Sequence, residues 1–310
     1  MGQPTTSVVV CAYTLDRWDL LAAAVREAGR QAHRPLEVVL VVDHNDELAA
    51  RARRELDLPG ISVVANGYRR GLSGARNTGV ERASGDVVAF LDDDAVPEPG
   101  WLAALVAPFC DPSVVATGGV ARPVWSQGRP EWFPREFDWV VGCSYRGQVS
   151  GAADIRNPLG CNMAFRRSVL ADAGGFREGV GRVGRQPLGC EETELCIRVR
   201  QRVPSARIVS VPDAVVDHFV SPDRHRFAYF RRRCFAEGMS KAVVTDTVGA
   251  GDGLSSERAY VTHALPTGVV AGLRSSVDDR TLAGAARSVA ILAGLGFTVA
   301  GYVRGRVVRS

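Results

Sequence analysis

Three consecutive aspartates, Asp92, Asp93 and Asp94, directly follow an apolar run at residues 87–91. Like charges at such close range repel, so each carboxylate disfavours the ionisation of its neighbours. A hard divalent cation would offset this repulsion, and it could bridge the carboxylates to phosphate oxygens. The pattern therefore predicts a metal-assisted phosphate site, with a helix N-cap or a solvated turn as the purely structural alternative.

Two further groups could do chemistry later in the chain. Glu191, Glu192 and Glu194 lie within residues 189–195, and a carboxylate at the edge of a pocket suits a general base that takes a hydroxyl proton. The structural alternative is an exposed acidic first turn of a helix, which the helix dipole favours.

His218 lies in the mostly apolar segment 215–220. Alone it is more often a structural histidine, but an imidazole beside carboxylates and phosphate would favour Mn²⁺ over Mg²⁺.

The elements that must position these groups show a clear pattern in the first 120 residues. Runs rich in Val, Ile and Leu predict strands at residues 8–11, 36–42, 61–64 and 87–91, and helices are expected near 16–31, 46–57, 72–84 and 99–109. Strands this apolar are typical of a mainly parallel sheet with helices on both faces, hence of an α/β fold. Ligands of such sheets bind beyond the carboxyl ends of the strands. The polar segments at residues 12–16, 43–46 and 92–94 follow three of those ends.

The periodicity changes after residue 120. Residues 121–160 contain many Pro, Gly and aromatic residues, including Trp132, and predict a long ordered loop. Helices are expected near 190–202 and 224–241, with strands at 207–211 and 214–217 between them. The basic and aromatic segment 224–241 could contact anionic lipid or an acceptor phosphate, or could be a solvated face.

The last sixty residues form a separate helical region. Residues 288–303 carry no charge and are bracketed by arginines, yet they are fewer than the roughly 20 apolar residues that a membrane span needs. A membrane-surface or re-entrant helix, a buried packing helix and a true span remain open.

Composition excludes several classes of protein. The 38 basic and 34 acidic residues leave a net charge of +4, too small for a dedicated nucleic-acid binder. Seven cysteines without a C-x-x-C pair predict reduced thiols and neither a zinc site nor a disulfide framework. No basic and apolar leader precedes the first strand, so a cytoplasmic location is expected.

The motifs, in their order, resemble the inverting family-2 glycosyltransferases with the Rossmann-like GT-A fold, over about residues 6–240. Residues 8–14 are similar to the family's first strand and nucleotide-contacting loop, and Val41-Val-Asp43 is similar to its second strand. Residues 71–79 resemble its arginine-containing turn and helix, and residues 90–94 resemble its D-x-D motif. The resemblance implies an inverting transfer from a nucleotide diphosphate sugar, with UDP as the default nucleotide.

The resemblance also implies roles for residues of this chain. The base is Glu192, where the family more often has aspartate, and Glu191 and Glu194 remain rivals. Mn²⁺ or Mg²⁺ would be held by Asp94, Asp92 and His218, with Asp92 also near the ribose. The donor sugar and acceptor pocket would include Gly160, Asn162 and Trp132. The nucleotide sugar would be bound by Ala12, Tyr13, Asp16, Asp43, Arg76, Asp92 and Asp93.

The expected organisation is a nucleotide-sugar half at residues 1–120, an acceptor-binding and catalytic half at 121–245, and a helical tail at 246–310 that could associate with the membrane. The acceptor could be a glycan, a lipid-linked intermediate or a small molecule, as in cell-envelope polysaccharide synthesis. The enzyme is expected to be peripheral at the inner face of the membrane.

The alternative functions are a polyprenyl-phosphate glycosyltransferase, a non-catalytic nucleotide or sugar-binding protein of the same fold, and an NAD-dependent oxidoreductase. The glycines of residues 71–79 argue against the last, because they do not form G-x-G-x-x-G after the first strand.

Overall fold

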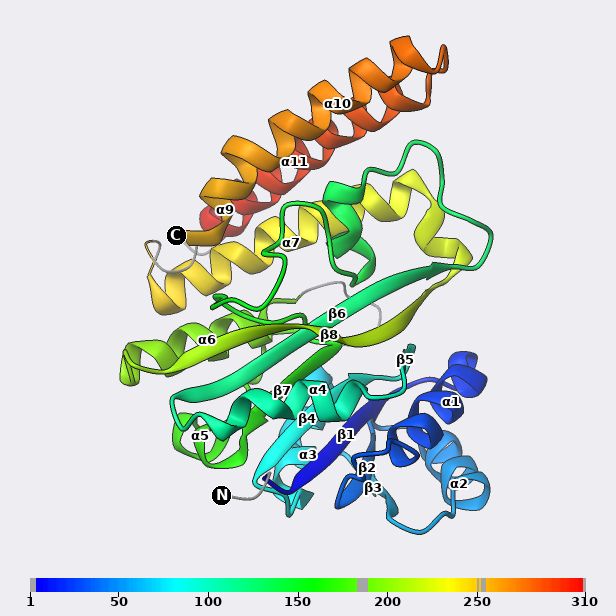
Figure 1. Ribbon diagram of the computed structural model, residues 1–310, viewed down its shortest axis with the longest axis vertical. Helices are drawn as coiled ribbons and strands as arrows, with labels where there is room; N and C mark the ends of the chain where they lie inside the picture. Colours follow the sequence, from blue (N-terminus) through cyan, green and yellow to red (C-terminus); the bar gives the residue numbers. More distant parts are fainter. Residues whose placement is uncertain (1–3, 183–188, 250, 252–254, 309–310) are drawn as a thin grey trace. The chain divides into compact units, whose positions relative to one another are not determined.

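The computed structural model describes residues 4–182, 189–249, 251 and 255–308. These residues form an eight-stranded sheet in the order β3-β2-β1-β4-β7-β6-β8-β5 (Figure 1). The parallel strands are β1 (Thr6–Ala12), β2 (Glu37–Val42), β3 (Ile61–Ala65) and β4 (Val87–Asp92). The antiparallel pairings involve β7 (Asn162–Arg166), β6 (Val114–Trp125), β8 (Arg207–Val220) and β5 (Ala95–Pro97).

The predicted α/β class is confirmed, and the sheet is mixed. The four strands expected in the first 120 residues are the parallel ones. The prediction of a loop over residues 121–160 was wrong in two places. Strand β6 continues to Trp125, and residues Arg135–Val141 form a 3₁₀ helix, η3. The two strands expected at 207–211 and 214–217 are one strand, β8. Pro212 and Asp213 lie on its exposed part, where a proline in a strand is tolerated.

Helices cover both faces of the sheet. One core contains Val8 and Val10 of β1 with residues of α1 (Trp18–Gly29), α2 (Asp46–Glu55) and α4 (Trp101–Val106). The other contains Val9 with residues of α3 (Leu72–Arg82), α5 (Arg167–Ala173) and α6 (Glu191–Arg202). Because alternate residues of a strand point to opposite faces, both sets must be apolar. This explains the continuous valine runs.

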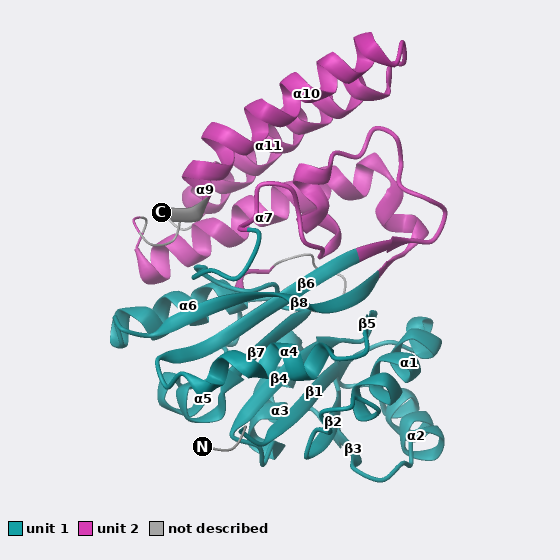
Figure 2. Cartoon of the chain, in the orientation of Figure 1, with its two compact units in different colours: residues 1–122, 150–186, 191–218 teal, residues 123–149, 187–190, 219–310 magenta. Residues whose placement is uncertain are grey.

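The chain divides into two compact units (Figure 2). Unit 1 comprises residues 1–122, 150–186 and 191–218, and unit 2 comprises residues 123–149, 187–190 and 219–310. The helices of unit 2 include α7 (Phe227–Val248), α10 (Leu265–Asp278) and α11 (Ala283–Val307). The helix expected near 224–241 is therefore α7, which begins after a 3₁₀ turn, η4 (Pro222–His225). The functional halves expected to meet at residue 120 remain a prediction.

Within unit 2, α7 and α11 contact each other through glycines. A Cβ atom at Gly301 would lie 1.9 Å from the carbonyl oxygen of Phe235, and one at Gly238 would lie 2.0 Å from that of Thr298. By contrast, a Cβ atom at Gly296 of α11 would meet nothing within 4 Å. The two helix backbones are therefore too close for any side chain at Gly301.

We expect Gly301→Ala to destabilise unit 2 by at least about 1–3 kcal/mol, the usual cost of overpacking. The matched variant Gly296→Ala, on the same helix, should stabilise by up to about 1 kcal/mol, because alanine is the better helix former. Urea unfolding followed by circular dichroism measures both. Equal changes in the two variants would contradict the close helix contact.

Candidate active site

The carboxyl ends of three neighbouring strands meet at one edge of the sheet in unit 1. The β-ladder pairs Cys11 with Asp92 and Ala12 with Val42. Tyr13, Asp43 and Asp93 therefore follow three adjacent strand ends, as the sequence pattern predicted. Ala12 is buried and accepts a hydrogen bond from the Asp43 amide at 2.8 Å through its carbonyl oxygen.

Asp92, Asp94 and His218 form a cluster at this edge. Each offers one ligand atom, and the three atoms lie within 4.8 Å of one another. His218 reaches the cluster because β5 pairs with β8 and places it opposite Ala95. Its Nε2 atom lies 3.3 Å from Asp94 Oδ1, and both side chains are buried. Two carboxylates and an imidazole form a donor set that fits a divalent cation such as Mn²⁺.

Arg17, which was not among the predicted site residues, contacts the same aspartates. Its guanidinium donates to Asp94 Oδ2 at 2.6 Å and to Asp93 Oδ2 at 2.9 Å. Burial alone would lower the pKa of Arg17, but the charges of Asp93 and Asp94 outweigh burial and raise it, so the side chain stays cationic. The sequence offers one hint, since Arg17 is the one basic residue between the end of β1 and the start of α1, but it does not identify the partners of Arg17.

Arg76 of α3 is completely buried beside the cluster. It donates to Glu191 Oε1 at 2.6 Å and to the Gly160 carbonyl oxygen at 2.9 Å, and it lies 3.6 Å from Asp92 Oδ1. Burial would lower the pKa of Arg76, but Glu191 and Asp92 raise it. Gly160 must be small, because a Cβ atom there would lie 2.9 Å from the guanidinium. One arginine thus holds together α3, the start of α6, the turn at residue 160 and the end of β4.

Asp43 organises the loop that leads into α3. Its Oδ1 atom accepts a hydrogen bond from Asn66 Nδ2 at 2.7 Å and lies 2.8 Å from His44 Nδ1. Its Oδ2 atom accepts from the Gly71 amide at 3.0 Å. The Asp43 carboxylate, which was predicted to bind the nucleotide sugar, is therefore rigidly held. Asp16, by contrast, is exposed on the turn after β1.

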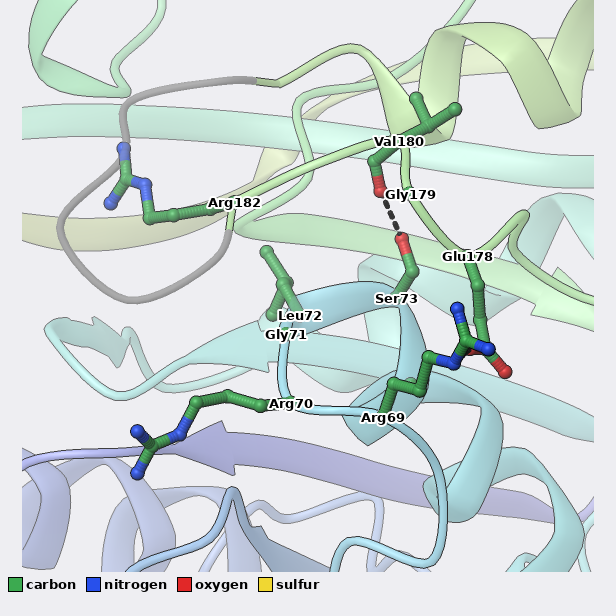
Figure 3. Close-up of a pocket in the computed structure, with 10 residues that line it drawn as sticks. Arg69, Arg70, Gly71, Leu72, Ser73, Glu178, Gly179, Val180 and Arg182 are labelled. Carbon is green, nitrogen blue, oxygen red and sulfur yellow. Dashed lines mark hydrogen bonds and ion pairs between the residues drawn. The ribbon is translucent and has the colours of Figure 1, made fainter.

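A cavity of about 210 Å³ opens at the start of α3 (Figure 3). Its lining includes Gly71, whose amide donates a hydrogen bond to Asp43. Its lining also includes Arg69, Arg70 and Arg182, with Glu178 as the acidic member. Ser73 closes one side by donating to the Val180 carbonyl oxygen at 2.6 Å. Its charged lining is thus mainly basic.

The three glutamates of α6 have different surroundings. Glu194 is completely buried, and both of its oxygens accept hydrogen bonds from Arg198, at 2.9 and 2.8 Å. Glu191 is 4% exposed and pairs with Arg76. Glu192 is partly exposed and accepts a hydrogen bond from the Thr193 hydroxyl at 3.1 Å.

Two residues expected in the sugar and acceptor pocket have structural contacts. Asn162 is fully buried, accepts from Trp101 Nε1 at 2.8 Å and donates to the carbonyl oxygens of Val120 and Ala214 at 3.0 and 2.9 Å. Trp132 belongs to unit 2, where it packs in an aromatic cluster with Phe133, Phe227 and Phe230. The roles of Asn162 and Trp132 in binding remain predictions.

Sequence comparisons match this chain to known glycosyltransferases. The model of glycosyl transferase family 2 matches residues 7–174. The glucosyl-dolichyl phosphate glucuronosyltransferase of Haloferax volcanii is 35% identical over 304 residues, which cover 96% of this chain and 95% of that protein. The pre-mycofactocin glycosyltransferase of Mycobacterium tuberculosis is 30% identical over 51% of this chain and 32% of its own.

Solved structures show the same fold. The mannosyltransferase PcManGT from Pyrobaculum calidifontis, in complex with GDP-Man and Mn²⁺, has a TM-score of 0.63 at 22% identity and covers 100% of this chain and 89% of its own. GalNAc-T7, with UDP, GalNAc and Mn²⁺, has a TM-score of 0.55 at 18% identity and covers 79% of this chain and 50% of its own. The family match and the Haloferax relative exclude the oxidoreductase alternative. The chain therefore belongs to glycosyl transferase family 2 and is a glycosyltransferase of the GT-A type.

Proposed function

We propose that this enzyme transfers a sugar, with inversion, from a UDP-sugar to a hydroxyl group of a sugar linked to a polyprenyl phosphate. The observation that carries the proposal is the cluster of Asp92, Asp94 and His218 at the strand ends, beside the buried Arg76. The Haloferax relative supports the lipid-linked acceptor, because it matches almost the whole chain and its name specifies a glucosyl-dolichyl phosphate.

In this proposal Asp92, Asp94 and His218 hold a divalent cation, and the imidazole nitrogen favours Mn²⁺ over Mg²⁺. When bound, such a cation would offset the negative charge of the diphosphate. Tyr13 and Asp43 bind the nucleotide at the neighbouring strand ends. Arg76 fixes the positions of Asp92 and of the turn at residue 160.

We assign the catalytic base to Glu192. Glu194 is committed to Arg198, and Glu191 neutralises Arg76. Glu192 is the one of the three that is partly exposed. Its carboxylate takes the acceptor hydroxyl proton while the hydroxyl oxygen forms a bond to the anomeric carbon. The bond from that carbon to the diphosphate oxygen breaks, and the nucleoside diphosphate leaves with the electron pair.

The donor sugar that we favour is a hexuronate. The Haloferax relative is named a glucuronosyltransferase, and an acidic sugar carries a carboxylate that needs a positive partner. The cavity at the start of α3 offers Arg69, Arg70 and Arg182 next to the residues held by Asp43. Arginine binds carboxylates well because its planar group can donate two parallel hydrogen bonds.

We further propose that the enzyme lies on the membrane surface through α11. Among the described residues, α11 is the one helix long and apolar enough to cross a membrane. Its other face packs on α7, whose partly buried Glu237 pairs with Arg233 and Lys241. A helix attached to such a charged neighbour fits a surface location better than a span. The large exposed apolar side chains of α11 are Val289, Leu292, Val299, Val303 and Val307.

The assignment of the base predicts that Glu192→Gln lowers transfer by about 10²–10⁴-fold and leaves binding of UDP with Mn²⁺ unchanged. The assay measures transfer from radiolabelled UDP-glucuronate to glucosyl polyprenyl phosphate. The matched control is Glu55→Gln on the exposed face of α2, which should behave as wild type. Equal transfer by wild type and Glu192→Gln would exclude Glu192 as the base. Absence of product from the wild-type enzyme would argue against this donor and acceptor.

The buried pair predicts strong coupling between Arg76 and Glu191. Arg76→Met should cost about 3–5 kcal/mol of stability, because it leaves the buried Glu191 carboxylate uncompensated. The double variant Arg76→Met/Glu191→Leu should lose clearly less than the sum of the two single variants. The control cycle uses the exposed pair Arg51 and Glu55, whose coupling should be only about 0.3–0.5 kcal/mol. Urea unfolding measures both cycles, and additive losses at Arg76 and Glu191 would show that the pair is not coupled.

A further inference from the structure

The carboxylate cluster at the strand ends already contains a cation supplied by the chain. Three adjacent aspartates were expected to need a metal ion to offset their repulsion, but Arg17 supplies positive charge to two of them. Its guanidinium lies 2.6 Å from an oxygen of Asp94 and 2.9 Å from an oxygen of Asp93. The side chain is 17% exposed, so water screens these contacts weakly.

Arg17 and the candidate metal site contact different oxygens of the Asp94 carboxylate. Both hydrogen bonds from Arg17 end on Oδ2 atoms, whereas Oδ1 of Asp94 faces His218 Nε2 at 3.3 Å. Arg17 therefore does not have to leave when a cation is bound between Asp94 and His218. A bound cation would instead lie close to a fixed positive charge.

The position of Arg17 is fixed by local structure. It ends a 3₁₀ turn, η1 (Leu15–Arg17), whose Asp16 amide is capped by the Thr14 hydroxyl at 3.2 Å. Its guanidinium also lies 5.3 Å from the centre of the Tyr13 ring, a favourable cation–π distance. Tyr13 is on the segment that we assign to the nucleotide, so the charge sits between that segment and the aspartates.

We propose that Arg17 weakens the binding of a free divalent cation at Asp92, Asp94 and His218, so that the site retains the metal firmly only together with a nucleoside diphosphate. The inference rests on the proposed function for the existence of the metal site.

The charge balance of the cluster supports this. Four carboxylates, Asp92, Asp93, Asp94 and Glu191, face the two guanidiniums of Arg17 and Arg76. Without Arg17 the cluster would be more negative by one charge and would attract a dication more strongly. A diphosphate supplies that missing negative charge, so Arg17 couples metal binding to donor binding and favours release of the metal once the diphosphate departs.

The test is a titration of Mn²⁺ into the metal-free full-length protein, with free Mn²⁺ measured by electron paramagnetic resonance, first alone and then with saturating UDP. Arg17→Gln should bind Mn²⁺ alone at least about tenfold more tightly than wild type, since a neighbouring like charge is removed. The gain in Mn²⁺ affinity on adding UDP should be smaller in Arg17→Gln than in wild type. Arg17→Lys, which keeps the charge, should resemble wild type.

The matched control is Arg51→Gln, which removes one positive charge from the arginine stacked on the adjacent Trp18, 4.3 Å from its ring centre. It should leave Mn²⁺ binding unchanged. A weaker or equal Mn²⁺ affinity in Arg17→Gln, or an increase shared by Arg17→Lys, would overturn the inference and leave the metal site standing. Failure of every protein, wild type included, to bind Mn²⁺ in the presence of UDP would overturn the metal site itself and the inference with it.

Discussion

The active site depends on the pairing of buried carboxylates with two arginines. Removing one partner of a buried ion pair leaves an uncompensated charge, at a cost of several kcal/mol, so segments that carry such partners are held firmly together. Arg76 joins α3 to Glu191 at the start of α6, to Gly160 and to Asp92 at the end of β4. Arg17 joins the turn after β1 to Asp93 and Asp94. Electrostatic compensation therefore determines the geometry on which donor binding and catalysis rest.

Both parts of the mixed sheet contribute to this site. The parallel strands β1, β2 and β4 bring their carboxyl ends to one edge, which positions Tyr13, Asp43 and Asp92. The antiparallel pairing of β5 with β8 adds His218. In unit 2, glycine contacts between α7 and α11 leave the valine-rich face of α11 exposed. We therefore propose that one unit carries the chemistry and the other provides the attachment to a lipid surface.

Sequence reasoning predicted the elements that have a strong local pattern. The valine runs identified β1 to β4, and the repulsion among three successive aspartates indicated a cation site at the end of β4. The antiparallel strand β6 was missed, because its two glycines and its proline mask its alternation. Arg17 was missed because its partners lie 76 and 77 residues away, and no local periodicity reports a pairing at that separation. The environments of Glu191 and Glu194 likewise required tertiary contacts to distinguish them from Glu192.

The central claim is that Asp94 belongs to a metal site through which the donor's diphosphate is bound. The most direct measurement is calorimetric binding of UDP to the wild type and to Asp94→Ala, each with Mn²⁺ and again with EDTA. The account predicts that the wild type binds UDP much more tightly with Mn²⁺ than with EDTA, and that Asp94→Ala loses this difference. Equal affinity of the wild type under both conditions, or an unchanged metal effect in Asp94→Ala, would contradict it.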